Sequence, residues 1–303
     1  MSAALPDAGG SRDPSVSDRG SLPRLSQREF GEFAALIYNR CGIHLAPIKL
    51  IMLSSRLSKR LRALSFESFA QYLEYVRSPK GMDAELVHLI DVVTTNKTEF
   101  FREPKHYDIL TQKVLPDLAR RGHVRRLRLW SAGCSTGEEP YTLAMVLDRW
   151  CSTNGGSYSI TASDISTRVL ETAGRGVYQS RHIESIPENY RREYLMRGKD
   201  RMSGLFRIVP ELRNRVDFMR INLVDDAGFG IQQKFDIIFC RNVVIYFDRE
   251  TQTALFDRFW RQLAPGGYLF IGLSETLHRI NDKFVSLTGS VYHKPESEQQ
   301  EEG

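Results

Sequence analysis

The sequence predicts an α/β fold: an open, mostly parallel, doubly wound sheet, preceded by an all-helical domain and carrying a small inserted β-subdomain. Three observations predict it. Residues 25–93 show only helical periodicity, short apolar strands then alternate with helical stretches, and several of these strands end in polar residues. With 303 residues, 41% of them apolar, the chain is long enough to bury the cores of two compact domains.

The N-terminal part is expected to be a disordered leader followed by a domain of helices. Residues 1–24 are rich in Ser, Gly, Pro and Asp, with little that could be buried. A capping box from Ser26 to Glu29 then opens the first helix of the domain 25–93. The helices after it are expected at 47–64, 65–77 and 83–93.

The helix expected from Pro47 to Leu64 combines an apolar stripe with a strongly cationic face. No acidic residue occurs between Ala46 and Leu64. A solvated helix face is the ordinary explanation of such a charge run, and a docking surface for a negatively charged partner is the sharper one. The absence of compensating acids favours docking. The basic side chains concerned are Lys49, Arg56, Lys59 and Arg60.

A second domain, residues 94–294, begins where the helical periodicity stops. Polar residues surround two phenylalanines between Thr94 and Pro104, which is typical of a loop that takes part in function. A helix is expected from about Pro104 to Arg120. The expected strands are 126–130, 157–162, 215–220, 235–240 and 268–272.

Residues 175–215 interrupt this alternation of strands and helices. They contain a helix-like stretch, 187–196, and an alternating stretch, 204–209, which together indicate an inserted β-subdomain at the edge of the sheet. Beyond the second domain, residues 295–303 form an acidic tail.

The stretch from Leu127 to Leu147 changes from strand to helix through small residues that let a ligand approach the backbone. Glu138 and Glu139 stand in the first turn of the helix. Two carboxylates there favour a ligand with hydroxyls or a positive charge over a pyrophosphate. The alternative is that both acids only complement the helix dipole. Which of the two points inward stays open.

Polar residues also follow the other strands, where a doubly wound sheet places its ligands. Asp164 lies at the end of the second strand, the position from which an acid binds a ribose diol in this architecture. A nucleoside ligand is therefore predicted. The other strand ends carry Asn222, Arg241, Asn242 and Glu275.

Composition excludes several classes of protein. The four cysteines are scattered without Cys-x-x-Cys or paired His spacing, so neither a zinc site nor a disulfide framework is indicated. No segment reaches the roughly 20 apolar residues that a bilayer span requires, and no signal peptide is visible. A cytoplasmic protein without direct membrane insertion is expected. The net charge of +5 allows an acidic partner, either nucleic acid or protein.

Five segments together resemble one family. They are Thr-Thr-Asn-Lys-Thr-Glu-Phe-Phe-Arg-Glu (94–103), Ser-Ala-Gly-Cys-Ser-Thr-Gly-Glu-Glu-Pro-Tyr (131–141), Ala-Ser-Asp-Ile (162–165), Asn-Leu (222–223) and Phe-Cys-Arg-Asn-Val-Val-Ile-Tyr-Phe (239–247). They resemble the CheR chemotaxis receptor methyltransferases, which are S-adenosylmethionine-dependent protein-glutamate O-methyltransferases. The resemblance covers about residues 25–294.

The resemblance implies S-adenosylmethionine as the cofactor, S-adenosylhomocysteine as the product, and no metal. It implies that Arg102 and Tyr246 lie at the reacting groups and that Asn96, Thr98 and Arg102 belong to a loop over the cofactor. The cofactor-binding residues implied in all are Asn96, Thr98, Arg102, Ala132, Glu138, Asp164, Asn222, Leu223, Arg241 and Asn242.

The implied partner is the cytoplasmic domain of chemoreceptors, the methyl-accepting chemotaxis proteins, bound through the basic helix. Two other classes compete with this interpretation. A nucleic-acid methyltransferase would share the cofactor domain, but the chain shows no aromatic-and-basic RNA-binding motif, so no nucleic-acid partner is expected. A non-catalytic adaptor that senses S-adenosylmethionine is disfavoured because Arg102 and Tyr246 are both present.

Overall fold

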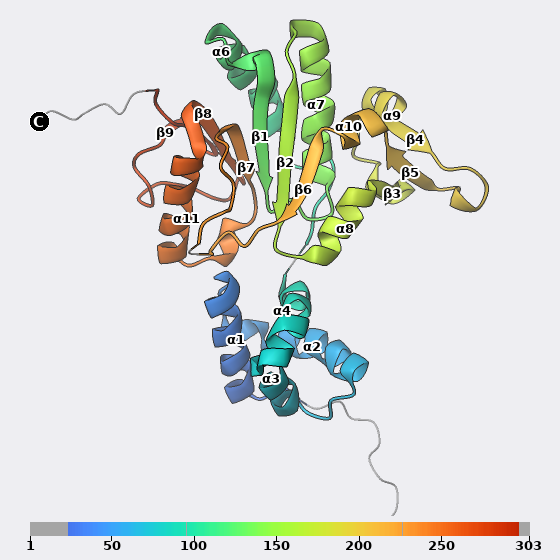
Figure 1. The fold of residues 1–303 in the computed structure, drawn as a ribbon, viewed down its shortest axis with the longest axis vertical. Coiled ribbons are helices and arrows are strands. Elements are labelled where there is room, and N and C mark those ends of the chain that lie inside the picture. Colours follow the sequence, from blue (N-terminus) through green and yellow to red (C-terminus); the bar gives the residue numbers. More distant parts are fainter. Residues whose placement is uncertain (1–23, 95, 226, 297–303) are drawn as a thin grey trace, which may run out of the picture.

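The computed structural model describes residues 24–94, 96–225 and 227–296 and confirms the predicted fold class. A body of helices and a larger body built on a sheet lie end to end (Figure 1). The leader expected at 1–24 and the tail expected at 295–303 lie outside the described residues, except for positions 24, 295 and 296.

The N-terminal body consists of helices packed on buried side chains such as Phe33, Leu57 and Tyr72. The capping box is present, because the Ser26 hydroxyl accepts the Glu29 N–H while the Glu29 carboxylate accepts the Ser26 N–H. The elements of this body are α1 (Gln27–Cys41), the 3₁₀ turn η1 (Pro47–Lys49), α2 (Leu50–Leu64), α3 (Phe69–Arg77) and α4 (Pro79–Val93).

Two helix starts differ from expectation for local reasons. The third helix begins at Phe69 rather than at 65, because Ser65 ends α2 in the left-handed conformation (φ 60°) and the Ser68 side chain caps α3. The fourth begins at Pro79 rather than at 83. Ser78 caps it, and proline suits the first position of a helix.

The larger body is built on a seven-stranded sheet of order β6-β2-β1-β7-β8-β10-β9. The strands from β6 to β8 are parallel, and β10 runs antiparallel to both β8 and β9. Strand order switches between β1 and β7. The strands are β1 (Leu127–Ala132), β2 (Tyr158–Asp164), β6 (Val216–Arg220), β7 (Phe235–Cys240), β8 (Leu263–Ile271), β9 (Val285–Thr288) and β10 (Val291–His293).

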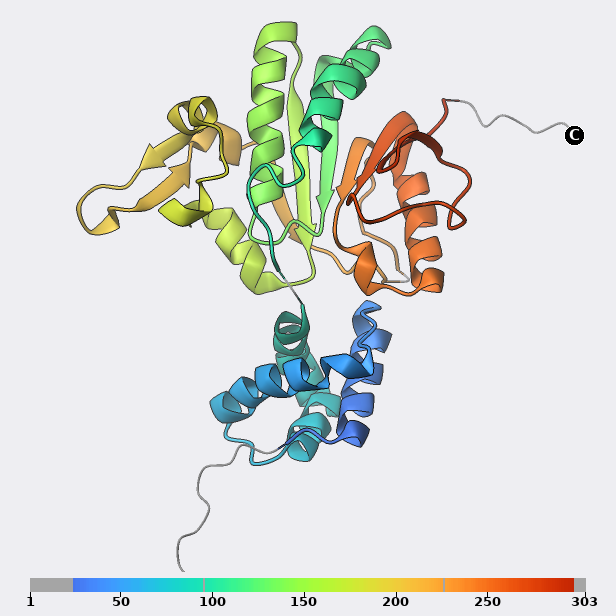
Figure 2. The ribbon, with the colours of Figure 1, turned by 180° about the vertical axis from the view of Figure 1, so that it is seen from behind.

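Helices cover both faces of this sheet, as a doubly wound fold requires (Figures 1 and 2). On one face α7 packs Leu143 and Leu147 into the core, and on the other α11 packs Phe259 against Trp130. The stretch expected as one helix from 104 to 120 contains a π-helical turn, η2. The elements are α5 (Lys105–Ile109), η2 (Leu110–Val114), α6 (Leu115–Arg120), η3 (His123–Arg126), α7 (Glu138–Asn154), α8 (Thr167–Arg175), η6 (Val244–Tyr246) and α11 (Arg249–Gln262).

The interruption expected at 175–215 contains a separate three-stranded antiparallel sheet of order β3-β5-β4, which extends from one side of the larger body (Figure 1). The helix expected at 187–196 is shorter, because residues 195 and 196 pair with β5 instead. The elements are β3 (Val177–Gln179), η4 (Ser180–His182), α9 (Glu188–Tyr194), β4 (Leu195–Arg197), η5 (Asp200–Met202), β5 (Leu205–Ile208) and α10 (Pro210–Arg213).

Candidate functional site

A cavity lies at the carboxyl ends of the central strands, beside the switch between β1 and β7. Its volume is about 120 Å³, whereas one buried water needs only about 10–15 Å³. The helical body closes one side of it through Cys41, Ile43 and Val93. Most of the predicted site residues line it, namely Asn96, Thr98, Arg102, Asp164, Asn222, Leu223, Arg241, Asn242 and Tyr246.

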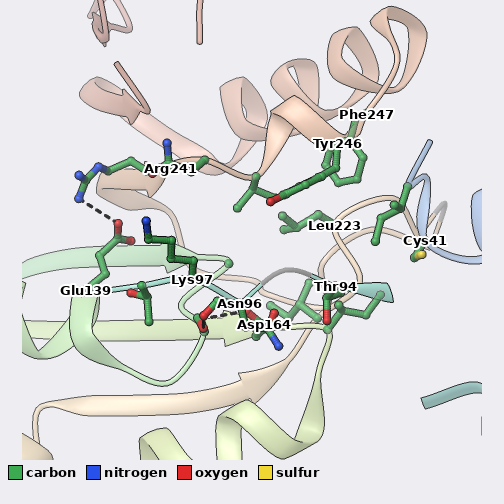
Figure 3. Close-up of a pocket in the computed structure, with 18 of the residues that line it drawn as sticks. Cys41, Thr94, Asn96, Lys97, Glu139, Asp164, Leu223, Arg241, Tyr246 and Phe247 are labelled. Atoms are coloured by element: carbon green, nitrogen blue, oxygen red, sulfur yellow. Dashed lines mark hydrogen bonds and ion pairs between the residues drawn. The ribbon is translucent and has the colours of Figure 1, made fainter. Parts of the chain in front are cut away.

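One end of the cavity carries a charged pair. Glu139 and Arg241 form an ion pair there, Cys41 lies at the opposite end, and Asp164 and Tyr246 lie between (Figure 3). The cavity therefore suits an elongated ligand with a charged end and a less polar end.

The turn between β1 and α7 shapes the floor of the cavity. Gly133 has φ +86°, and a Cβ atom there would lie 2.4 Å from Cγ2 of Val243, so any other residue would be strained and would displace Val243. Ala132, the last residue of β1, is fully buried and does not line the cavity. The structure thus does not place Ala132 where a direct cofactor contact was predicted.

Asp164 links this turn to the end of β2. Its carboxylate accepts the N–H of Ser135 (2.9 Å) and that of Ser166 (3.0 Å). Burial raises the pKa of Asp164, although these backbone hydrogen bonds act in the opposite direction. Each carboxylate oxygen has a second lone pair, so the group can still accept hydrogen bonds from a ligand's hydroxyls.

The two acids at the start of α7 have different surroundings. Glu139 lines the cavity and accepts hydrogen bonds from the Ser131 hydroxyl (2.7 Å) and from Arg241 (3.2 Å). Glu138 does not line it, and its carboxylate accepts the Thr136 hydroxyl (2.6 Å). The acid that lines the cavity in this structure is therefore Glu139, whereas Glu138 was the one named as a cofactor-binding residue.

Arg241 is the centre of a buried charge network, with its side chain 1% exposed. It donates to the Glu103 carboxylate (3.0 Å), to Glu139 (3.2 Å) and to the Tyr107 hydroxyl (3.2 Å). Burial acts to raise the pKa of Glu103, but the charge of Arg241 and the hydrogen bonds from Arg241 and Asn242 together hold that pKa below its ordinary value. For Glu139 the effect of burial is larger than that of the nearby charge of Arg241, and the pKa of Glu139 is raised. Arg241 thus has two roles: it forms buried ion pairs with Glu103 and Glu139, and it lines the cavity.

His106 lies beneath this network and is fully buried. Burial, followed by the nearby charge of Arg241, lowers the pKa of His106 to about 4. Its ring is therefore neutral near pH 7, and its Nε2 lies 2.8 Å from the Ser290 hydroxyl. It adds no cation beside Arg241.

Glu275 braces the loop that follows β7. Its carboxylate accepts the N–H groups of Gly272 (2.6 Å), Asn242 (3.0 Å) and Ile245 (3.3 Å). These three bonds hold the backbone of Asn242 and Ile245 to the end of β8, and Asn242 itself is left-handed with φ 58°. No role was predicted for Glu275 from the sequence, although it follows shortly after the end of β8, where such a sheet places functional side chains.

Left-handed backbone is frequent around the cavity. Phe101, Glu103, Ser135 and Asn242 all have φ between 49° and 58° without being glycine. Each such residue costs on the order of 1–3 kcal/mol and persists only where its surroundings hold it. This clustering is typical of a functional site.

The remaining predicted residues join the cavity from different elements. Arg102 donates from Nη1 to the backbone oxygen of Lys97 (2.8 Å), which folds the loop 96–102 back on itself. Asn222 donates from Nδ2 to the backbone oxygen of Arg40 (2.7 Å), so this side chain joins the sheet body to α1.

Two basic side chains of α2 already have hydrogen-bond partners within the helical body. Arg60 pairs with Glu85 of α4, and Arg56 donates to the backbone oxygens of Val92 (2.9 Å) and Thr94 (3.0 Å). The assumption that no acid compensates this face is therefore wrong for Arg60, and Arg56 is occupied by backbone oxygens rather than by an acid. An open groove of about 640 Å³ nevertheless runs along α2. Its basic lining residues are Arg56, Lys59, Arg60, His88 and Arg168.

Neither a metal site nor a membrane-spanning helix is found among the described residues. No cluster of three or more His, Cys, Asp or Glu side chains could hold a metal ion within them. No helix in the same part of the chain is long and apolar enough to cross a bilayer.

Comparison with known proteins identifies both bodies. Residues 96–293 match the family model "CheR methyltransferase, SAM binding domain", and residues 28–94 match "CheR methyltransferase, all-alpha domain". A chemotaxis protein methyltransferase of Borreliella burgdorferi is 38% identical over 89% of this chain and 95% of its own length. A chemotaxis protein methyltransferase of Salmonella typhimurium is 40% identical over 88% of this chain and 90% of its own.

Proposed function

Since the chain belongs to the CheR methyltransferase family of S-adenosylmethionine-dependent enzymes, we propose that it methylates glutamate side chains of chemoreceptors. The products would be glutamate methyl esters and S-adenosylhomocysteine, and the role would be sensory adaptation. One observation supports the proposal above all: four residues from separate segments of the chain line one cavity. They are Arg102, Glu139, Asp164 and Tyr246.

The cavity fits S-adenosylmethionine chemically. The carboxylate of Glu139 and the guanidinium of Arg241 complement the ammonium and carboxylate of the methionine end. Asp164 offers acceptors for the ribose hydroxyls. The apolar side chains of Ile165, Leu223 and others suit the adenine ring.

When bound, S-adenosylmethionine supplies a methyl group already activated on a sulfonium. A glutamate carboxylate is already nucleophilic at neutral pH, so no residue of the chain has to act as a general base. Catalysis is then mainly positioning, which supplies about 7–11 kcal/mol in well-oriented systems. Arg102 would orient the substrate carboxylate, and Tyr246 would align it or shape the methyl channel. An ion pair that is too tight would quench the nucleophile, so orientation must outweigh neutralisation.

The test is a calorimetric titration with S-adenosylmethionine and S-adenosylhomocysteine, followed by an assay for base-labile methyl esters on chemoreceptor cytoplasmic domains. We expect binding of both compounds and ester formation that depends on receptor glutamates. Binding without methyl transfer would indicate the non-catalytic adaptor instead. Methyl transfer to RNA but not to receptor would indicate a nucleic-acid methyltransferase.

The position of Glu139 gives a prediction about affinity. Glu139→Gln should weaken S-adenosylhomocysteine binding by about 10-fold, because a charged hydrogen-bonding group of the cavity is lost. Glu138→Gln, one residue away and bonded to Thr136, should change it by less than about twofold. Calorimetry on the two variants measures the difference, and a larger effect at Glu138 would contradict this assignment.

We also propose that the groove along α2 docks an acidic segment of the receptor, which the basic residues around it favour. Lys59, which is exposed, tests this better than Arg56 or Arg60, which hold the helical body together. Lys59→Glu should raise the KM for receptor about 3- to 10-fold at low salt and leave S-adenosylhomocysteine affinity unchanged.

A matched control is Lys113→Glu, which reverses an exposed lysine on the sheet body. It should leave the receptor KM unchanged. Equal effects of the two variants, or no effect of either, would mean that α2 presents only a solvated face.

A further inference from the structure

The end of α1 is held against the segment that carries Tyr246. The Tyr38 hydroxyl donates to Oδ2 of Asp248 (2.6 Å), two residues beyond Tyr246. The His44 N–H donates to the backbone oxygen of Tyr246 itself (2.9 Å). The helical body therefore holds this segment both at Tyr246 and just after it.

A second segment of the cavity wall touches the same turn. Asn222 donates from Nδ2 to the backbone oxygen of Arg40 (2.7 Å). A Cβ atom added to Gly42, where φ is +68°, would lie 2.8 Å from Cγ1 of Val224 and 3.1 Å from Cγ2 of Thr251. Since there is no free space at this contact, a shift of α1 must move the wall as well.

Asp248 connects α1 to α11 because each of its two carboxylate oxygens accepts a hydrogen bond. Oδ1 accepts the Thr251 N–H (2.9 Å) and so caps α11, while Oδ2 accepts the Tyr38 hydroxyl. The carboxylate is thereby fixed between α1 and the start of α11. The short turn η6, which contains Tyr246, is in turn fixed between Asp248 and the Glu275 brace.

We propose that Tyr38 is a positioning residue for methyl transfer, which acts through Asp248 on Tyr246. The helical body then completes the reaction site in addition to docking a partner. This rests on the proposed function through the role given to Tyr246. Without the Tyr38 hydroxyl, Asp248 still caps α11 through the Thr251 N–H. Helix α1, however, loses its charge-assisted hydrogen bond to the segment that contains Tyr246.

The test is Tyr38→Phe in the full chain. We expect kcat for receptor methylation to fall about 3- to 10-fold, the scale on which residues without ligand contact act through a neighbour. The receptor KM should stay within about twofold, because the groove along α2 is intact. Amide hydrogen exchange should become faster at His44 and across residues 244–248, a readout that requires no turnover.

Two further variants sharpen the result. Tyr75→Phe is the matched control, because Tyr75 packs on Phe66 in the same body at a ring distance of 5.3 Å and should change none of these quantities. Asp248→Asn replaces the charged acceptor of the Tyr38 hydroxyl by a neutral amide, so the charge-assisted hydrogen bond is lost and a similar fall in kcat is expected. The double variant with Tyr38→Phe should then lose little more than either single variant.

A lower melting temperature for Tyr38→Phe with unchanged kcat and unchanged exchange at 244–248 would overturn the proposal. So would equal effects of Tyr38→Phe and Tyr75→Phe. Faster exchange at 244–248 in a protein whose unaltered form makes no methyl ester would support the contact and refute the proposed function.

Discussion

Arg102→Ala should lower kcat for receptor methylation by on the order of 10²-fold and change S-adenosylhomocysteine affinity by less than about threefold. The structure gives the reason for this split. The backbone oxygen of Arg102 accepts a hydrogen bond from Arg241, so the loop stays anchored to the network when the side chain is removed. What is lost is a guanidinium beside the cavity, where only one of its donors is used by Lys97.

Two controls accompany this prediction. Arg102→Lys keeps the charge but not the planar array of donors, so it should restore only part of the lost turnover. Arg28→Ala removes an arginine whose side chain is 91% exposed, and both kcat and affinity should then be unchanged. Losses of equal size in kcat and in affinity for Arg102→Ala would mean that the residue only clamps the cofactor.

The sheet and the location of the site could be predicted because they depend on local patterns. Apolar runs such as the one at Phe235–Cys240 are completely buried, and the carboxyl ends of parallel strands meet at one edge whatever the loops do. The edge strand β9 and its neighbour β10 were missed. They have four and three residues, and β9 is mostly exposed, so neither shows a clear apolar alternation.

Contacts between distant segments could not be predicted from the same patterns. Glu85 lies 25 residues after Arg60 and compensates it, and Glu103 lies 138 residues before Arg241. Neither pairing leaves a periodic signal. The question of which acid faces the cavity, Glu138 or Glu139, stayed open for a related reason. Adjacent residues at the start of a helix differ by about 100° in direction, and only the packing of α7 decides which one faces the cavity.

Arg241→Met should give the largest loss of stability, about 3–5 kcal/mol in the free energy of unfolding. The substitution leaves the carboxylates of Glu103 and Glu139 without their shared cation in a site where Glu139 is already costly to ionise. It also removes the donor to the Arg102 backbone oxygen, so S-adenosylhomocysteine binding should be lost together with stability. Urea unfolding and calorimetry measure the two effects.

The pH dependence of Arg241→Met distinguishes this cause from a simple packing defect. Without the cation, burial raises the pKa values of Glu103 and Glu139 in the folded protein above those of the unfolded chain. Between the folded and unfolded pKa values the folded state binds more protons, so stability should increase as pH falls through the raised folded-state values toward the ordinary pKa of glutamate. A packing defect would give a loss that does not change with pH relative to the unsubstituted protein.

Neutralising the acids provides the complementary test. Adding Glu103→Gln and Glu139→Gln to Arg241→Met should recover much of the lost stability, because no buried charge then lacks a partner. S-adenosylhomocysteine binding should stay weak, since the charged end of the cavity is gone. If this triple variant is no more stable than Arg241→Met, the network does not hold the loops 96–104 and 241–246 together, and the positions of Arg102 and Tyr246 must depend on the Glu275 brace and the α1 contact.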